Sequence, residues 1–182
     1  MQDTSLSSPP PTSRPTGHDP GRRGPAAAAA VLVALLVLGG CSGSDEASEA
    51  ERQAEVAERG ADVMPFDLDA TTHRFEPTAD GLVQTVVADD SADAKQVALV
   101  RAHLAEEARR FRGGDYSDPA VIHGHDMPGL ADLEDGAVTV ELTEVDAGAR
   151  LTFTTADPAL VDALHAWAEA QLMDHGAHAE PT

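Results

Sequence analysis

Hydrophobic and polar positions alternate in two short stretches that follow residue 64. Residues 72–76 and 82–87 are rich in β-branched and aromatic side chains, and the Asp80-Gly81 turn signal between them indicates a β-hairpin. A helix of about twenty residues is predicted next, because apolar side chains recur at spacings of three and four from a cap at Asp90. Its apolar stripe consists of Val97, Val100, Leu104, Ala108 and Phe111.

The second half of the chain repeats this pattern. Residues 138–142 and 151–154 are predicted to form another hairpin around residues 146–148. Asp157 then caps a helix that has proline at its first position. The apolar face of this helix consists of Leu160, Val161, Leu164, Trp167, Ala168 and Leu172.

The two halves correspond with a constant offset. Gly81 stands nine residues before Asp90, and Gly148 stands nine residues before Asp157, so the offset is 67 residues. One hairpin with one helix buries too little surface to be stable alone. We therefore predict an α+β two-layer sandwich for residues 64–179, with a tail over residues 180–182. A four-stranded antiparallel sheet from the two ββα units would carry both helices on one face.

The first 40 residues are typical of an export signal. A leader with three arginines precedes an unbroken apolar run over residues 26–38, which is short for a membrane span. The following Leu-Gly-Gly-Cys segment resembles the lipobox of bacterial lipoproteins, in which the cysteine is lipidated. Cys41 is the single cysteine of the chain. The sequence thus predicts a lipid anchor on Cys41 and a location on the extracytoplasmic face of the cell membrane. A single-pass anchor would have the same consequence.

Charge narrows the range of partners. The chain has 32 acidic and 12 basic residues among 182, a net charge of −20, which disfavours nucleic acid and anionic lipid surfaces as partners. Residues 41–63 contain mainly Ser, Gly, Ala and Glu without a sustained apolar stripe. We predict that they form an acidic stalk, with a fraying helix over residues 46–59.

The segment between the two halves, residues 115–136, holds closely spaced candidate ligands. Residues 122–129 read Ile-His-Gly-His-Asp-Met-Pro-Gly, and their glycines and proline favour a loop with one short helical turn starting at Pro128. Histidine is the commonest metal ligand, and a methionine thioether suits copper. Another histidine pair ends the second helix. These observations predict a copper or zinc site with the ligands His123, His125, Met127, His175 and His178.

Simpler interpretations exist for these and the other histidines. His123 can hold an irregular chain by bonding the backbone, and residues 174–178 can form a solvated tail. His103 and Glu107 lie four residues apart on the first helix, which is more typical of a surface pair than of a metal site. His165 borders the apolar face of the second helix, where we expect it to pack.

Several motifs between residues 63 and 179 occur together. They are Met64-Pro65-Phe66-Asp67-Leu68, Thr71-Thr72-His73, Asp118-Pro119, Ile122-His123-Gly124, Asp126-Met127-Pro128-Gly129, Asp157-Pro158-Ala159-Leu160-Val161-Asp162-Ala163 and Asp174-His175-Gly176. This combination resembles a family of small bacterial proteins that often carry the label aspartate carbamoyltransferase. True carbamoyltransferases bind carbamoyl phosphate with a Ser-Thr-Arg-Thr-Arg segment, which this sequence lacks, and need two α/β domains. The resemblance therefore implies neither carbamoyl transfer nor a catalytic residue.

The sequence as a whole favours a lipid-anchored extracytoplasmic binding module that holds a transition metal. The first alternative is an interaction or structural lipoprotein of the envelope whose histidines only pack, with a protein partner that the sequence does not identify. The second is an enzyme acting on a small envelope metabolite. The sequence contains no Gly-x-Ser-x-Gly, His-Glu-x-x-His, paired cysteines or glycine-rich phosphate loop.

Overall fold

The computed structural model describes residues 42–181, with side chains from residue 46 onward. The predicted export signal and Cys41 lie outside the described residues. The elements follow in the order α1 (Ser42–Val63), a 3-10 turn (Leu68–Ala70), β1 (Thr71–Thr78), β2 (Gly81–Ala88), α2 (Ala94–Phe111), α3 (Ser117–His123), α4 (Leu130–Asp135), β3 (Thr139–Val145), β4 (Gly148–Thr154), α5 (Pro158–His175), a second 3-10 turn (Gly176–His178) and β5 (Ala179–Pro181). None of the described helices is long and apolar enough to cross a membrane.

The sheet confirms the predicted α+β class and adds a strand to it. The strand order is β3-β4-β2-β1-β5, and the two predicted hairpins meet where β2 pairs antiparallel with β4. The sheet is not the predicted four-stranded antiparallel one, because β5 pairs parallel with β1, with Ala179 opposite His73. Residues 180 and 181 of the predicted tail therefore belong to the sheet edge, and residue 182 lies outside the described residues. Three residues are too few to show a strand period, and β1 would otherwise present an unpaired edge.

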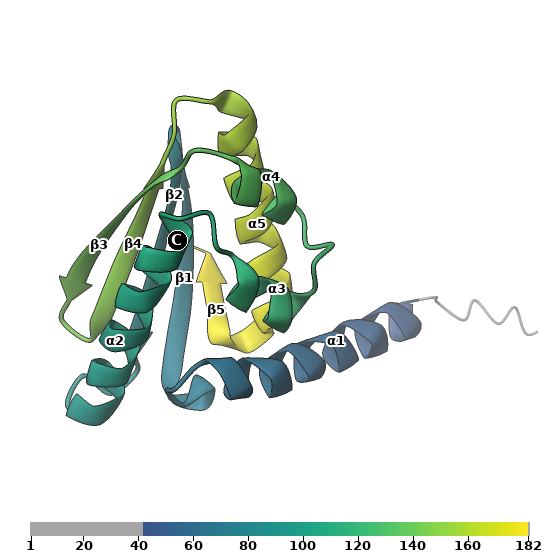
Figure 1. The fold of residues 1–182 in the computed structure, drawn as a ribbon. Helices are drawn as coiled ribbons and strands as arrows, with labels where there is room; N and C mark the ends of the chain where they lie inside the picture. The colour runs from purple at the N-terminus through teal and green to yellow at the C-terminus, as the bar shows by residue number, and fades with distance from the viewer. Residues whose placement is uncertain (1–41, 182) are drawn as a thin grey trace, which may run out of the picture. The chain divides into compact units, whose positions relative to one another are not determined.

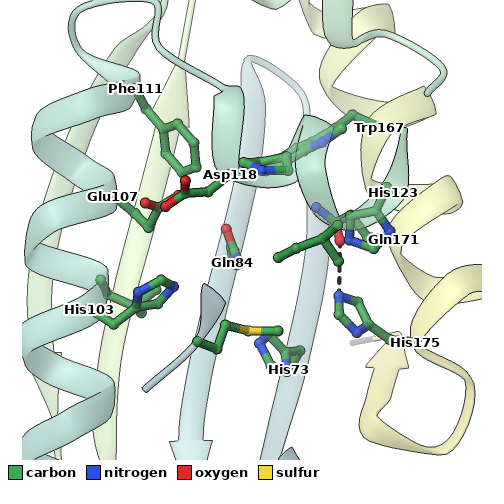
Figure 2. Close-up of a pocket in the computed structure, with 14 residues that line it drawn as sticks. His73, Gln84, His103, Glu107, Phe111, Asp118, His123, Trp167, Gln171 and His175 are labelled. Atoms are coloured by element: carbon green, nitrogen blue, oxygen red, sulfur yellow. Dashed lines mark hydrogen bonds between the residues drawn. The ribbon is translucent and has the colours of Figure 1, made fainter. Parts of the chain in front are cut away.

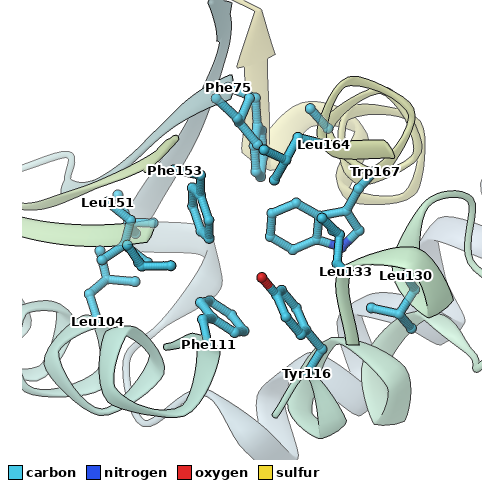
Figure 3. Close-up of a cluster of buried hydrophobic side chains, with 14 of the residues drawn as sticks. Phe75, Leu104, Phe111, Tyr116, Leu130, Leu133, Leu151, Phe153, Leu164 and Trp167 are labelled. Carbon is cyan, nitrogen blue, oxygen red and sulfur yellow. The ribbon is translucent and has the colours of Figure 1, made fainter. Parts of the chain in front are cut away.

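Helices α2 and α5 cover the same face of the sheet (Figure 1). The ring centroid of Phe153 on β4 lies 5.8 Å from that of Phe111 on α2 and 5.7 Å from that of Trp167 on α5. Figure 3 shows these rings around the centre of the apolar core, together with Phe75 and Tyr116. The core thus lies between one sheet face and the two long helices.

The offset of 67 residues has a structural cause. Gly81 and Gly148 begin the two central strands, where Gly81 pairs with Thr154 and Gly148 pairs with Val87. A Cβ atom at Gly81 would lie 1.9 Å from the carbonyl oxygen of Phe153, and one at Gly148 would lie 2.0 Å from that of Val86. The second strand of each hairpin therefore begins with glycine because its backbone touches the other hairpin.

Caps set the starts of the long helices. Asp157 caps α5 as predicted, because its Oδ1 accepts a hydrogen bond from the backbone of Ala159 at 2.9 Å. The cap of α2 is Asp93 and not the predicted Asp90. Asp90 accepts from the backbone of Ala92 in the turn before the helix. Two acids three residues apart offered equivalent caps in the sequence.

Residues 42–63, the described part of the predicted stalk, do not form a detached stalk. Helix α1 contacts α3 and α5, and its Val56 is only 1% exposed. This part of the prediction is wrong because two valines seven residues apart in a charged helix, Val56 and Val63, form no sustained apolar stripe in the sequence, whereas the partners of α1 come from distant parts of the chain. The domain therefore includes at least the second half of α1.

The central segment is also more regular than predicted. Residues 117–123 form α3, which ends at Gly124 with a φ of 99°. Residues 130–135 form α4, which begins after Gly129 and not at Pro128. His123 is consequently the last residue of a helix, a position that fixes its side chain more firmly than a loop would.

Candidate functional site

A cavity lined with polar side chains lies between the sheet and helices α2, α3 and α5 (Figure 2). Its volume is about 40 Å³, which is room for about three water molecules. Its polar lining comprises four histidines, two acids and two glutamines: His73, His103, His123, His175, Glu107, Asp118, Gln84 and Gln171. Such a set is uncommon in the interior of a domain that needs its core for stability.

Two of these residues come from the inward face of the first hairpin. His73 on β1 pairs with Val86, and Gln84 on β2 pairs with Phe75. Strand residues alternate between faces, so His73 and Gln84 stand where an apolar side chain would pack against the helices. His73 is 4% exposed and Gln84 is 9% exposed.

His123 is held by an acid from α5. Its Nδ1 lies 2.8 Å from Oδ2 of Asp174. An ionised carboxylate only accepts hydrogen bonds, so His123 donates from Nδ1 and its Nε2 carries the lone pair. Burial lowers the pKa of His123, although the bond to Asp174 acts in the opposite direction. The imidazole is therefore neutral near pH 7.

Arg52 of α1 supports this pair. Its Nε and Nη2 donate to the two carboxylate oxygens of Asp174 at 2.9 and 2.7 Å, and Nη2 also donates to the carbonyl oxygen of His123 at 2.6 Å. Burial opposes ionisation of Asp174, but the bonds from Arg52 and His123 lower its pKa overall. The fork geometry of arginine suits this two-point contact.

His175 lies between two other imidazoles. Its Nε2 is 3.1 Å from Oε1 of Gln171, one helical turn earlier, so Nε2 donates and Nδ1 carries the lone pair. The ring of His73 stacks on it at 4.9 Å between centroids and 6° between planes. The ring of His123 meets it edge-on at 4.9 Å and 78°. Burial lowers the pKa of His73 to about 4 and that of His175 well below its ordinary value.

A pair of carboxyl groups occupies the other side of the cavity (Figure 2). Burial raises the pKa of Glu107 to about 8, and its hydrogen bond to Asp118 acts in the same direction. Arg110 holds Asp118 through Nη1 at 2.5 Å. Glu107 is thus a neutral acid at pH 7, and Asp118 is the member of the pair that the arginine stabilises.

Four polar atoms of the lining are buried without a hydrogen-bond partner among the residues that the structure describes. They are Nδ1 of His73, Oε1 of Gln84, Oε1 of Glu107 and Nε1 of Trp167. Oε1 of Glu107 is 3.9 Å from Nη1 of Arg110, too far for a hydrogen bond. Each buried polar atom left unpaired costs about 1–3 kcal/mol.

No family model matches this chain, and neither does any curated protein or solved structure. The chemistry of the cavity is therefore inferred from its own residues. Neutral imidazoles with a free lone pair accept hydrogen bonds or bind a metal ion, and the unpaired oxygens of Gln84 and Glu107 are acceptors, whereas the indole N–H of Trp167 is a donor. The cavity can bind a small molecule that both donates and accepts hydrogen bonds, or an ion with coordinated water.

The structure separates the five ligands that the sequence predicts. His123 and His175 meet in the cavity, but His125 is exposed on the far side of Gly124. Met127 is buried in the apolar core, and His178 lies at the sheet edge with Nε2 3.5 Å from Oδ1 of Asp69. Within residues 46–181, no group of three or more His, Cys, Asp or Glu side chains is arranged to hold a metal ion. The five residues therefore do not form one site.

Sequence analysis missed most of the lining. His103 and Glu107 are not an ordinary surface pair, because both side chains line the cavity. His73 had a detectable signal, since it alternates with Phe75 on the inward face of a strand. Gln171 lies one helical turn before His175, a spacing at which the two side chains meet. Arg52 gave no signal, because its partners are 71 and 122 residues away in the sequence.

Proposed function

We propose that the protein is a lipid-anchored extracytoplasmic binding module that holds a small polar ligand in the cavity beneath α2, α3 and α5. The observation that carries this proposal is a group of four buried polar atoms, on residues that line one cavity, that have no hydrogen-bond partner in the described part of the chain. Polar groups at core positions lower stability unless something pairs with them, and proteins tolerate such departures chiefly at functional sites.

The volume and the neutral side chains of the cavity also limit which ligands can bind. A volume of about 40 Å³ admits a few non-hydrogen atoms, or one ion with its water, and excludes a nucleotide or a peptide side chain of ordinary size. The imidazoles and Glu107 are neutral near pH 7, because burial lowers the pKa of His73 and raises that of Glu107. Recognition then depends on hydrogen bonds or coordination and not on opposite charge.

The proposed location rests on the sequence alone. The apolar run over residues 26–38 and the Leu-Gly-Gly-Cys segment support lipidation of Cys41. In a bacterial host, Cys41→Ala should abolish incorporation of labelled palmitate and leave the larger precursor. Unchanged labelling of this variant would contradict the anchor without bearing on the cavity.

Trp167 offers a direct test of the cavity. It is the sole tryptophan of the chain, it is fully buried, it lines the cavity, and its indole nitrogen has no hydrogen-bond partner among the described residues. Protein labelled with ¹⁵N-tryptophan therefore gives one indole N–H signal. We would titrate it with urea, acetamide, formate, zinc(II) and copper(II).

The proposal predicts that at least one of these probes changes the Trp167 signal in a saturable manner. The matched variant is Gln84→Leu, which keeps the size of the side chain but removes its unpaired oxygen. This variant should be as stable as the parent protein or more so, and its Trp167 signal should respond more weakly to the same probes. If no probe changes the signal of the parent protein, the polar lining is structural, and the interaction or structural lipoprotein becomes the better account.

A further inference from the structure

We propose that the ligand of this cavity is a divalent transition-metal ion of the copper or zinc type, bound by Nε2 of His123 and Nδ1 of His175. This inference rests on the proposed function, because it names the ligand of the same cavity. It replaces the five-residue site predicted from the sequence with a pair of imidazoles completed by water.

The separation of the two rings fits one shared ion. With metal–nitrogen distances of about 2.0–2.1 Å and near-tetrahedral angles, two imidazole centroids on one ion lie roughly 5 Å apart. The centroids of His123 and His175 are 4.9 Å apart, and their planes are inclined by 78°. The two rings therefore have the spacing of a metal-bound pair.

The hydrogen bonds of both rings leave the required nitrogens available. His123 donates Nδ1–H to Asp174 at 2.8 Å, and His175 donates Nε2–H to Gln171 at 3.1 Å. Metal-binding histidines almost always donate their other ring N–H in this way to a carboxylate or carbonyl oxygen. Such support on both rings, with Arg52 fixing Asp174, is what a two-histidine site requires.

His73 is not assigned as a third ligand. Its ring is nearly parallel to that of His175, at 6°, and lone pairs in two stacked planes cannot converge on one point. This geometry agrees with the finding that no group of three ligating side chains is formed in the described chain. The remaining coordination positions belong to water, for which the unpaired oxygens of Gln84 and Glu107 are suitable acceptors.

The test uses the full chain in detergent, without a histidine tag. Copper(II) and zinc(II) are titrated against a competing chelator, and the copper form is examined by pulsed electron paramagnetic resonance. We expect one equivalent of metal and a signal from two coordinated imidazoles. His123→Ala and His175→Ala should each lower affinity at least 100-fold, and Asp174→Asn should lower it about 10–100-fold.

The matched control is His125→Ala, which removes an exposed histidine two residues from His123 and should leave affinity unchanged. Loss of binding in this control, or unchanged binding in His123→Ala and His175→Ala, would overturn the assignment. If a variant fails to fold, the imidazole count in the parent protein still decides, because fewer than two imidazoles contradicts the site. If zinc(II) and copper(II) leave the Trp167 signal unchanged while urea, acetamide or formate shifts it, the metal assignment is wrong. The proposed function as a binding module is then still supported. If no probe changes the Trp167 signal, both the metal assignment and the proposed binding module are wrong.

Discussion

His123 and Asp174 form a buried hydrogen bond in which Nδ1 and Oδ2 are 2.8 Å apart, although 51 residues separate them in the sequence. The bond joins the end of α3 to the last turn of α5 and selects the tautomer of His123. It therefore fixes both where the free nitrogen of His123 points and which nitrogen is free. The proposed chemistry of the cavity therefore depends on this hydrogen bond.

Replacing Asp174 should weaken the fold as well as the site. Asp174→Asn removes the charge that faces Arg52 and lets His123 adopt either tautomer. We expect a loss of about 1–3 kcal/mol in the free energy of unfolding, measured with urea, because charge-assisted bonds of this burial are worth about that much. Asp162→Asn, which changes an exposed acid of the same helix, is the control and should behave as the parent protein. Equal stability of all three proteins would refute a structural role for the pair.

Arg52 should control the docking of α1. Arg52→Ala removes three hydrogen bonds to α5 and α3. Amide hydrogen exchange over residues 50–60 should become about tenfold faster, because local opening then costs less free energy. Arg52→Lys should recover only part of the protection, since an ammonium group cannot form the same two-point contact. Protection equal to that of the parent protein in Arg52→Ala would show that Val56 and the other contacts of α1 dock the helix without Arg52.

Glu107 should make the protein less stable as pH rises from about 4.5 to about 8. Its pKa is about 8 in the folded protein against 4.5 ordinarily, so the unfolded chain releases this proton first as pH rises. The stability that Glu107 contributes is complete below pH 4.5 and is lost as pH rises through about 8. Glu107→Gln should therefore gain stability over the parent protein at pH 8 relative to pH 5. Glu106→Gln, its exposed neighbour, should not show this difference, and a flat result for both would contradict the burial of Glu107.

His73 should change stability with pH in the opposite direction. Burial lowers the pKa of His73 from 6.5 to about 4. Between these pH values the imidazole is protonated in the unfolded chain but neutral in the folded protein. Stability should then fall as pH decreases from 6.5 towards 4. His73→Asn should reduce the slope of melting temperature against pH in this range. An unchanged slope would mean that His73 is not held neutral.

The glycines of the two hairpins should not tolerate a side chain. Gly81→Ala and Gly148→Ala each place a Cβ within 2.0 Å of a carbonyl oxygen in the other hairpin, so the backbone must move. We expect each to lose about 1–3 kcal/mol or more. Gly113→Ala is the control, because its Cβ would meet its nearest atom at 3.3 Å. Urea unfolding of the three variants decides whether the repeat has this steric cause.

Local patterns predicted the hairpins, both long helices and the α5 cap, because each depends on residues close in sequence. They could not predict that β5 joins the sheet or that α1 docks, since those contacts depend on an edge strand and on Arg52 with its distant partners. The same limit applies to the cavity. His123 and His175 were recognised as ligand types, but only the fold shows that Asp174 and Gln171 orient them and that His125 points away.

The most direct measurement of the account is the ¹⁵N spectrum of protein labelled at histidine, recorded at pH 7 before and after one equivalent of zinc(II). The account predicts neutral rings, with the proton on Nδ1 of His123 and on Nε2 of His175, and zinc-induced shifts at the opposite nitrogen of each ring. Charged rings, the reverse tautomers, or zinc-induced shifts confined to His125 and His178 would contradict it.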